Sequence, residues 1–420
     1  MKKRILSVLL IGLFVLQSAG CAGGGTGFSG KASDLMTGVL ARKPEEVLQK
    51  PDTALEAVTA VTDFGIRLLK ESLTEGENTL ISPLSVLYAL GMTANGAKGN
   101  TLSQFEEAFG LPVSSLNDCL YAYRTNLPET EACRFSIANS IWFRDDSDRL
   151  AVEQDFLQTN ADYYAADLFK APFDNATLKE INDWVKKNTN EMIPEILDTI
   201  PSDAVMYLIN AIAFEAEWEE IYRKNDVYQG VFTKEDGSVN NVEFMHSRES
   251  RYIEDNSATG FLKYYKDRNY AFVALLPTEG TSISDYISSL SGEHIASLLA
   301  NATHASVSAT IPKFTVHCST DMVSSLQALG ITDAFLGQAA DFSGLGTSKN
   351  GNIFISRVLH DTFLTVDEKG TKAGAATLVE ANDGAVMDTK RVFLNRPFVY
   401  MLIDCEHNVP IFIGTVMEVK

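Results

Sequence analysis

The order of the hydrophobic patterns along the 420-residue chain constrains its fold more than any other feature. Apolar residues recur at helical spacing from Thr53 onward, and Ser82-Pro83 supplies the cap and the first-turn proline that begin a helix. A further helix is predicted over Ile181–Ile196. Strand patterns dominate later, and the nearly continuous apolar run 205–214 is typical of a strand that is covered on both faces. Because helices come early and strands late, without a regular βαβ alternation, the sequence predicts an α+β fold with large mixed or antiparallel sheets.

The first 52 residues differ from the remainder and are expected to direct and tether a single domain. Residues 1–21 have a basic start and an apolar stretch that is too short for a membrane span, which is typical of a signal peptide. The stretch ends in Ala19-Gly20-Cys21, which resembles a bacterial lipobox apart from Ser18, where that motif has an aliphatic residue. Cys21 is therefore expected to carry a lipid, with simple secretion as the alternative, and either route places the protein outside the cell or on its surface. Residues 22–52 are predicted to be a flexible linker, and residues 53–420 one domain.

Composition excludes several classes of function. The net charge of −20 arises from interspersed acidic and basic residues without a basic stripe, so nucleic-acid binding is not expected. No segment after the leader is long and apolar enough to span a bilayer, which leaves the lipid as the one expected membrane contact. The remaining cysteines form no zinc spacing, and a Cys119–Cys133 bridge and free thiols both stay open. The other two are Cys318 and Cys405.

Motifs of enzymes are missing. Neither Gly-x-Ser-x-Gly nor His-Glu-x-x-His occurs, there is no phosphate-binding loop, and none of the six histidines stands in a metal-ligand spacing. No catalytic residue, metal or cofactor is therefore expected.

One segment of small residues carries the pattern of a strand although it reads as a surface loop. Residues 366–380 follow a strong strand and are rich in Gly, Ala and Thr. Written as a strand, the odd-numbered positions from Thr371 to Val379 share a small, uncharged face, and both charges, Lys372 and Glu380, lie on the other. Small side chains can enter a gap between packed strands where large ones would clash, and Gly370 allows a bend at the base.

This segment and several others resemble one family. The ten residues from Glu368 to Thr377 resemble the hinge of inhibitory serpins, and the resemblance covers about residues 52–420. Six further motifs appear in the family's order: residues 78–85, 96–101, 210–218, 311–314, 341–344 and 393–398, followed by the ending 411–414. Each is weak alone, but together they are specific.

The resemblance implies a serpin fold of three β-sheets and about nine helices, with an exposed reactive-centre loop at about residues 368–391. It implies an irreversible suicide-substrate inhibitor of serine proteases that is not itself an enzyme. The protease cleaves the loop and is acylated, and the loop then inserts into the central sheet and traps it. A monomer is expected. The alternative is a non-inhibitory serpin that acts as a surface binding or chaperone-like protein.

The resemblance also assigns roles to residues. The hinge comprises Glu368, Lys369, Gly370, Thr371, Lys372, Ala373, Gly374, Ala375, Ala376 and Thr377. A polar shutter beneath the strands that must part comprises Ser82, Ser85, Asn210 and His360. A breach at the top of the sheet comprises Trp218, Lys313 and Glu368, of which the last two are expected to form a modest ion pair.

The chemistry of the bait predicts the kind of protease. The reactive bond is expected within Gly384, Ala385, Val386 and Met387. No Lys or Arg follows the hinge until Lys390, which argues against a trypsin-like target with an acidic pocket. Small aliphatic residues favour elastase-like or subtilisin-like proteases, and Met387 leaves a chymotrypsin-like one open.

Overall fold

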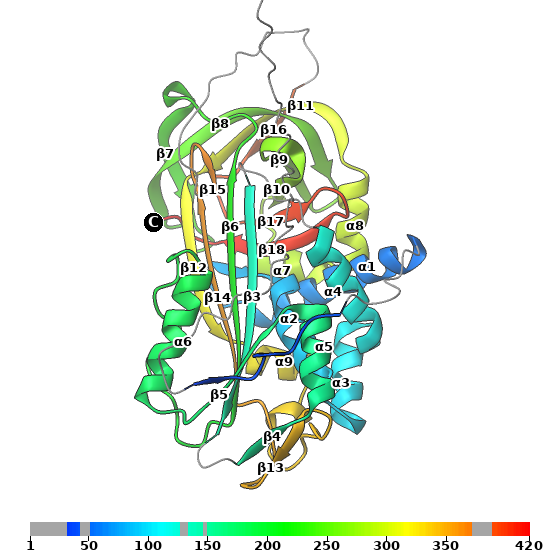
Figure 1. The fold of residues 1–420 in the computed structure, drawn as a ribbon. Coiled ribbons are helices and arrows are strands. Elements are labelled where there is room, and N and C mark those ends of the chain that lie inside the picture. The colour runs from blue at the N-terminus through cyan, green and yellow to red at the C-terminus, as the bar shows by residue number, and fades with distance from the viewer. Residues whose placement is uncertain (1–31, 43–50, 127–132, 146–148, 372–388) are drawn as a thin grey trace, which may run out of the picture.

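Helices pack around two large sheets, as the order of patterns predicted (Figure 1). The computed structural model describes residues 32–42, 51–126, 133–145, 149–371 and 389–420. Within these ranges there are nine α-helices and three sheets, which confirms the predicted α+β fold. The helices are α1 (Pro51–Ser72), α2 (Pro83–Ala94), α3 (Gly99–Phe109), α4 (Val113–Asn126), α5 (Gln154–Tyr164), α6 (Asn175–Asn188), α7 (Ile283–Ser289), α8 (Gly292–Ala300) and α9 (Val323–Ala328), with short 3₁₀ helices at Lys224–Asp226, Lys266–Arg268 and Asp333–Phe335.

The strands form sheets of seven, nine and two. In order across the seven-stranded sheet lie β1 (Ser33–Asp34), β5 (Asp167–Ala171), β3 (Cys133–Arg144), β6 (Met206–Glu217), β15 (Gly370–Thr371), β14 (Arg357–Val366) and β12 (Phe314–Asp321). The nine-stranded sheet runs through β16 (Lys390–Phe393), β11 (Thr303–Pro312), β8 (Val239–Glu254), β9 (Ala258–Tyr264), β10 (Tyr270–Pro277), β17 (Phe398–Asp404), β18 (Val409–Val416) and β2 (Thr79–Ile81), with β7 (Val227–Thr233) paired to β8. Strands β13 (Gly346–Ser348) and β4 (Leu150–Val152) form the third sheet.

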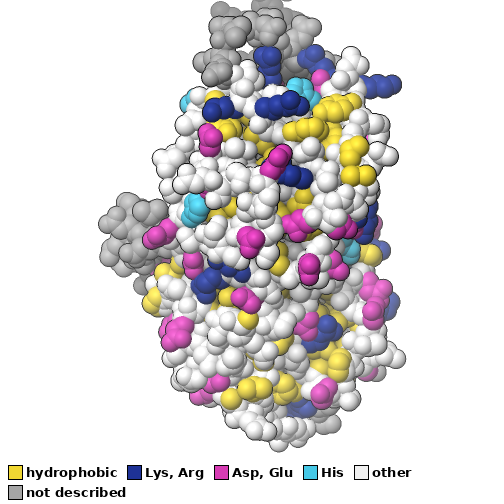
Figure 2. Space-filling view, turned by 180° about the vertical axis from the view of Figure 1, so that it is seen from behind, with side chains coloured by type: hydrophobic (Ala, Val, Ile, Leu, Met, Phe, Trp, Pro, Cys, Tyr) yellow, Lys and Arg dark blue, Asp and Glu magenta, His cyan; other side chains and the backbone are white. Residues whose placement is uncertain are grey.

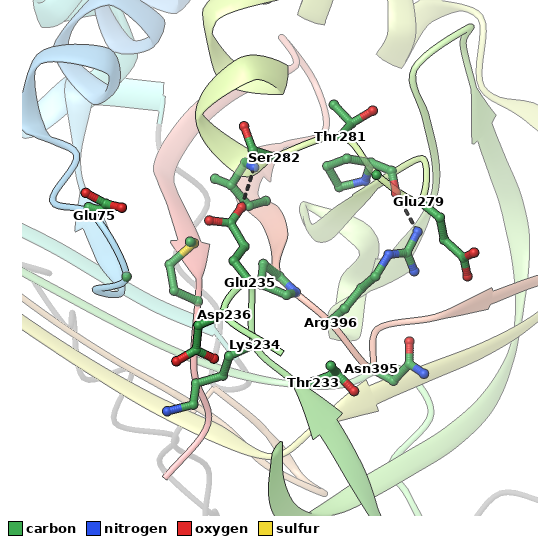
Figure 3. A pocket seen from close by; sticks show the side chains of 16 residues that line it. Glu75, Thr233, Lys234, Glu235, Asp236, Glu279, Thr281, Ser282, Asn395 and Arg396 are labelled. Atoms are coloured by element: carbon green, nitrogen blue, oxygen red, sulfur yellow. Dashed lines mark hydrogen bonds between the residues drawn. The ribbon is translucent and has the colours of Figure 1, made fainter. Parts of the chain in front are cut away.

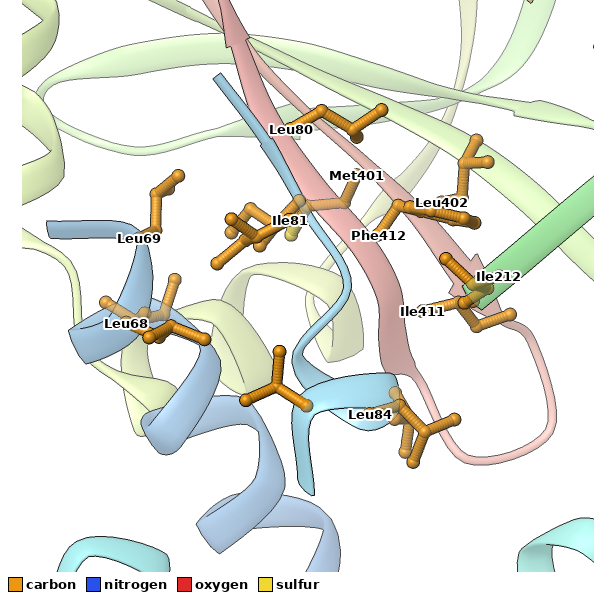
Figure 4. Close-up of a cluster of buried hydrophobic side chains, with 14 of the residues drawn as sticks. Leu68, Leu69, Leu80, Ile81, Leu84, Ile212, Met401, Leu402, Ile411 and Phe412 are labelled. Carbon is orange, nitrogen blue, oxygen red and sulfur yellow. The ribbon is translucent and has the colours of Figure 1, made fainter. Parts of the chain in front are cut away.

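The core fills the space between the two large sheets and helices α1 and α2. Every residue of α2 is buried, because this helix lies directly beneath the seven-stranded sheet. Ser82 caps it by accepting a hydrogen bond from the Ser85 N–H, and Pro83 occupies its first turn, as predicted. Figure 4 shows Leu68 and Leu69 of α1 facing the β17–β18 hairpin.

Helix α6 covers the other face of the seven-stranded sheet. Trp184 and Val185 pack with Tyr207 and Ile209 of β6, so β6 is buried on both faces, as its apolar run predicted. The lower part of this sheet is therefore a sandwich between α6 and α2.

The predicted bounds of α6 were wrong. The helix spans Asn175–Asn188 instead of Ile181–Ile196. It begins earlier because the Asp174 side chain accepts hydrogen bonds from two backbone N–H groups of the first turn. It ends earlier because Asn190 and Glu191 adopt positive φ values of 49° and 65°, which a right-handed helix does not permit.

Part of the stretch predicted to be a flexible linker, residues 22–52, packs against the domain. Residues 32–42 form β1 and a following turn along the edge strand β5. The Glu180 side chain accepts a hydrogen bond from the Ala32 N–H (3.0 Å), and Asp162 accepts one from the Arg42 N–H (2.7 Å). The linker prediction overlooked the free backbone groups of the β5 edge and the apolar residues that this segment packs against the core: Leu35, Met36 and Val39.

Charges on the back of the molecule are mixed. Figure 2 shows acidic and basic side chains interspersed over this face, in agreement with the pattern in the sequence. Among the described residues, none of the helices combines the length and hydropathy that crossing a bilayer requires.

Candidate functional site

The predicted hinge begins as a short strand inside the seven-stranded sheet. Thr371 pairs with Val366 of β14 on one side and with Ala216 of β6 on the other. Gly370 has φ +151°, and a Cβ built there would lie 2.0 Å from the Ala216 carbonyl oxygen, so this position requires glycine. The structure thus places the start of the loop in a slot between two long strands.

Below this slot β6 and β14 pair directly with each other. Their parallel pairing runs from Tyr207–Arg357 to Ala211–Asp361. The two strands keep the same register at the top, where Ala216 and Val366 flank Thr371. The lower half of the sheet is therefore closed and the upper end is held apart by β15.

Backbone carbonyls just before the slot are held from the end of β6. The Trp218 N–H donates to the Lys369 carbonyl (2.8 Å), and its indole Nε1–H donates to the Asp367 carbonyl (2.9 Å). The Tyr222 N–H donates to the Glu368 carbonyl (2.9 Å). Three consecutive carbonyls are thus fixed by two residues.

The predicted ion pair at the top of the sheet is formed, and it has a third member. Lys313 contacts the Glu368 carboxylate and also donates to Glu243 Oε2 at 2.8 Å. Partial burial opposes ionisation of Glu368, but the hydrogen bond and charge of Lys313, a backbone hydrogen bond and the charge of Lys369 together outweigh it and lower the pKa of this carboxyl. Each of the three side chains is at least a quarter exposed, and ion pairs exposed to this degree contribute little to stability.

The four residues of the predicted shutter lie together beneath the closed part of the sheet. His360 Nε2 accepts from the Ser82 N–H (3.0 Å), and His360 Nδ1 lies 2.8 Å from Asn210 Oδ1. The Ser85 hydroxyl donates to Asn210 Oδ1, and the Asn210 amide donates to the Ser85 carbonyl (2.9 Å). Asn139 of β3 completes the cluster by accepting from the same amide.

The hydrogen bonds determine the charge and tautomer of His360. Since Nε2 accepts from a backbone N–H, it carries no proton, and Nδ1–H donates to Asn210. Complete burial lowers the pKa of His360 to about 3, so the ring is neutral at physiological pH.

Several predicted residues lie outside the described part of the chain. They are the hinge residues 372–377, the reactive-bond residues Gly384, Ala385, Val386 and Met387, and Cys21.

Other residues of this region were not predicted. They are Asn139, Tyr222, Glu243, Glu249, Lys263 and Tyr265. Among them, Lys263 could have been recognised from the sequence, because a lysine within the apolar pattern of a strand is unusual. The others stand in ordinary strands and turns without a motif.

Among the described residues no disulfide joins Cys119 to Cys133, so the bridge that the sequence left open is not formed. Within the described ranges there is also no group of three or more His, Cys, Asp or Glu side chains arranged for a metal ion.

A hollow of about 800 Å³ lies away from these residues, between the loop after β10 and the turn that joins β7 to β8 (Figure 3). Arg396 donates to the Pro277 carbonyl there, and the Ile283 N–H donates to Glu235 Oε1 at 2.7 Å. None of the predicted hinge, shutter or breach residues lines it. Its charges of both signs are partly satisfied by these local contacts.

Comparisons with known proteins agree with this geometry. The family model described as Serpin (serine protease inhibitor) matches residues 59–419. The crystal structure of the thermophilic serpin tengpin in its native state is similar, with a TM-score of 0.88 and 46% identity over 93% of this chain and 100% of that chain. The leukocyte elastase inhibitor of Equus caballus is 29% identical over 82% of this chain and 94% of its own length. An uncharacterised serpin-like protein of Thermococcus kodakarensis is 27% identical over 86% of each chain.

Proposed function

Because the chain belongs to the serpin family of serine protease inhibitors, we propose that it traps proteases by inserting its own cleaved loop into the seven-stranded sheet. The observation that carries the proposal is the position of β15. Thr371, the first residue after the bend at Gly370, already pairs with both β6 and β14, so the loop begins as a strand in the slot that it would fill.

The register of the sheet supports insertion of the whole hinge. Because β6 and β14 have one register above and below, they can part around a new strand without sliding along each other. Continuing the pairing of β15 would bring Thr377 between Asn210 and His360, on the core side of the sheet. Its hydroxyl would then meet the polar cluster that β6 and β14 now share.

Charges on the outer face fit the same register. The continued pairing would place Lys372 beside Glu215 of β6, and Glu380 beside Arg357 of β14. Opposite charges directly across neighbouring strands stabilise a sheet. Lys372 and Glu380, the two charged residues of the stretch 371–380, would therefore each meet a partner of the opposite sign.

The energy is sufficient in order of magnitude. Roughly a dozen new backbone hydrogen bonds, at about 1 kcal/mol net each, supply on the order of 10 kcal/mol. This is comparable to the stability of a whole domain, so the uncut form would be kinetically trapped.

We propose an elastase-like or subtilisin-like target. Small residues precede and follow the predicted reactive bond between Gly384 and Met387, and they suit a small binding pocket. The similarity to an elastase inhibitor from horse is consistent with this choice.

The test is incubation with elastase, subtilisin, chymotrypsin and trypsin, followed by electrophoresis in SDS. We expect an SDS-stable adduct with elastase or subtilisin, and cleavage within residues 384–387 by mass spectrometry. The matched control is Thr377→Arg, which should be cut at the same bond but form no adduct, because an arginine cannot enter the core side of the sheet. Absence of an adduct with all four proteases would favour a non-inhibitory, binding role.

We also propose that the mature protein is a monomer held at the cell surface by a lipid on Cys21. The leader sequence, which ends in Ala19-Gly20-Cys21, supports the lipid anchor. Labelling with a fatty-acid analogue in a bacterial host should mark the wild-type protein and leave Cys21→Ser unlabelled; equal labelling of both would contradict the anchor.

A further inference from the structure

A buried ion pair lies next to the residues that hold the hinge. Lys263 of β9 is 2% exposed, and its Nζ donates to Glu249 Oε1 of β8 at 3.0 Å. The Ser247 hydroxyl donates to the same oxygen at 2.6 Å. Such a pair is costly to desolvate, so its presence calls for a structural or functional reason.

The lysine contacts both residues that bind the loop. Its Nζ lies 4.5 Å from the centre of the Tyr222 ring and 5.3 Å from that of the Trp218 ring, within the range of cation–π attraction. It also donates to the Glu220 carbonyl at 3.2 Å, between these two residues in the chain. One ammonium group thus fixes the segment 218–222 by two rings and one carbonyl.

The same segment binds the chain just before the slot. The backbone carbonyls of residues 367–369 accept their hydrogen bonds from Trp218 and Tyr222. The Trp218 ring stacks on Tyr265 with centroids 4.3 Å apart, and the Tyr265 hydroxyl lies 2.7 Å from the Thr371 hydroxyl. A shift of Trp218 would therefore change the contacts on both sides of Gly370, at residues 367–369 and at Thr371.

We infer that Lys263 and Glu249 are positioning residues that set how firmly the start of the reactive loop is held. The pair keeps Trp218 and Tyr222 in the geometry that binds residues 367–369, and it thereby slows entry of the uncut loop into the sheet. The second half of this statement rests on the proposed function, whereas the first half concerns the native structure only.

The experiment replaces the pair without leaving a buried charge. The double variant Lys263→Met/Glu249→Gln keeps the side-chain lengths and removes both charges. The matched control is Arg268→Gln, which breaks the exposed Arg268–Glu219 pair (2.7 Å, 60% and 38% exposed). This pair joins the short helix Lys266–Arg268, which follows β9, to the same segment 218–222. Ser247→Ala is a milder variant that removes one hydrogen bond to Glu249 and the 3.3 Å contact between the Ser247 and Tyr222 hydroxyls, and it serves if the double variant does not fold.

Hydrogen exchange of the native, unreacted protein gives the first measurement. We expect the peptide that holds the Trp218 and Tyr222 amides to exchange about tenfold faster in the double variant and by a smaller factor in Ser247→Ala, with α3 unchanged. Arg268→Gln should match the wild type. Unchanged exchange at these amides, or an equal increase throughout the protein, overturns the inference.

The second measurement is the rate at which the uncut protein converts, on warming, to a heat-resistant form. We expect this rate to rise at least about threefold in the double variant and to stay unchanged in Arg268→Gln. Faster exchange without faster conversion would overturn the claim about loop entry. If the wild-type protein forms no SDS-stable adduct with any of the four proteases, the proposed function is wrong. The hydrogen-exchange measurement still tests the positioning role of Lys263 and Glu249, because it concerns the native protein only.

Discussion

At the scale of single residues, the buried cluster around His360 has no spare hydrogen-bonding capacity at Asn210. The side-chain oxygen Oδ1 of Asn210 accepts hydrogen bonds from the Ser85 hydroxyl and from His360 Nδ1–H. The side-chain NH₂ of Asn210 donates to the Ser85 backbone carbonyl and to Asn139 Oδ1. A buried amide with all its bonds made fixes the geometry of its neighbours, since any rearrangement leaves a polar group unpaired. This cluster is the polar contact that must open before β6 and β14 can part below Thr371.

The neutral state of His360 predicts how stability depends on pH. Its pKa is about 3 in the folded protein and near 6.5 when unfolded, so the unfolded chain binds more protons between these values. Stability from this residue is therefore complete above pH 6.5 and is lost as the pH falls toward 3. Between pH 6.5 and 4.5 we expect wild type to lose about 2–3 kcal/mol more of its free energy of unfolding than His360→Asn.

Urea unfolding of both proteins at several pH values measures this difference. The comparison with the variant removes the contribution of other groups whose pKa changes on folding, such as Asp361, whose pKa is raised by burial. Parallel pH profiles for the two proteins would show that His360 does not titrate in this way.

Gly370 gives a second prediction at this scale. In Gly370→Ala the new Cβ would meet the Ala216 carbonyl, and the positive φ adds strain. We expect the free energy of unfolding to fall by about 2 kcal/mol or more. Gly280→Ala is the matched control, because Gly280 has φ +86° with open space around its Cα, so it should show the strain of about 1 kcal/mol alone. If both variants lost the same free energy of unfolding, β6 would be able to move away from the new Cβ without an energetic cost.

At the scale of elements, the sequence predicted what periodicity and local chemistry encode. The cap at Ser82, the burial of β6 on both faces and the bend at Gly370 each follow from a few neighbouring residues. Pairings between distant segments were predicted only where the family resemblance supplied them, as for the four shutter residues. Lys263 and Glu249 meet through a contact between two strands that no local pattern encodes. The packing of residues 32–42 on β5 was missed for the same reason.

The register between the loop and its neighbours is testable by charge exchange. If insertion continues the pairing of β15, Lys372→Glu would face Glu215 and weaken insertion. We expect about two- to fivefold more inhibitor to be cleaved per protease trapped, because a cross-strand pair is worth about 0.2–1 kcal/mol. Adding Glu215→Lys should restore the wild-type ratio. Lys369→Glu, a change on the exposed residue before β15, is the control and should have no such effect; failure of the exchanged pair to recover would exclude this register.

At the scale of the whole molecule, the seven-stranded sheet is one structure with two halves in different states. The lower half is closed by direct pairing of β6 with β14 and is covered by α2 and α6, while the upper end is opened by the two residues of β15. Insertion would convert the lower half into a continuation of the upper one. The energetic difference between these two arrangements should therefore appear as a property of the entire fold.

Cleavage of the loop should raise the thermal resistance of the protein. If insertion releases on the order of 10 kcal/mol, a chain of this size should gain about 10–15 °C in Tm. The measurement is calorimetry of the protein before and after a cut within residues 384–387, made by a protease that is then removed. Thr377→Arg should be cut equally well but keep its original Tm, because its loop cannot complete the strand. Cleavage by itself also frees two chain ends, so the effect of the inserted strand is the difference in Tm between the cut wild type and the cut Thr377→Arg variant. If the wild type melts at the same temperature before and after the cut, the native sheet stores no such energy.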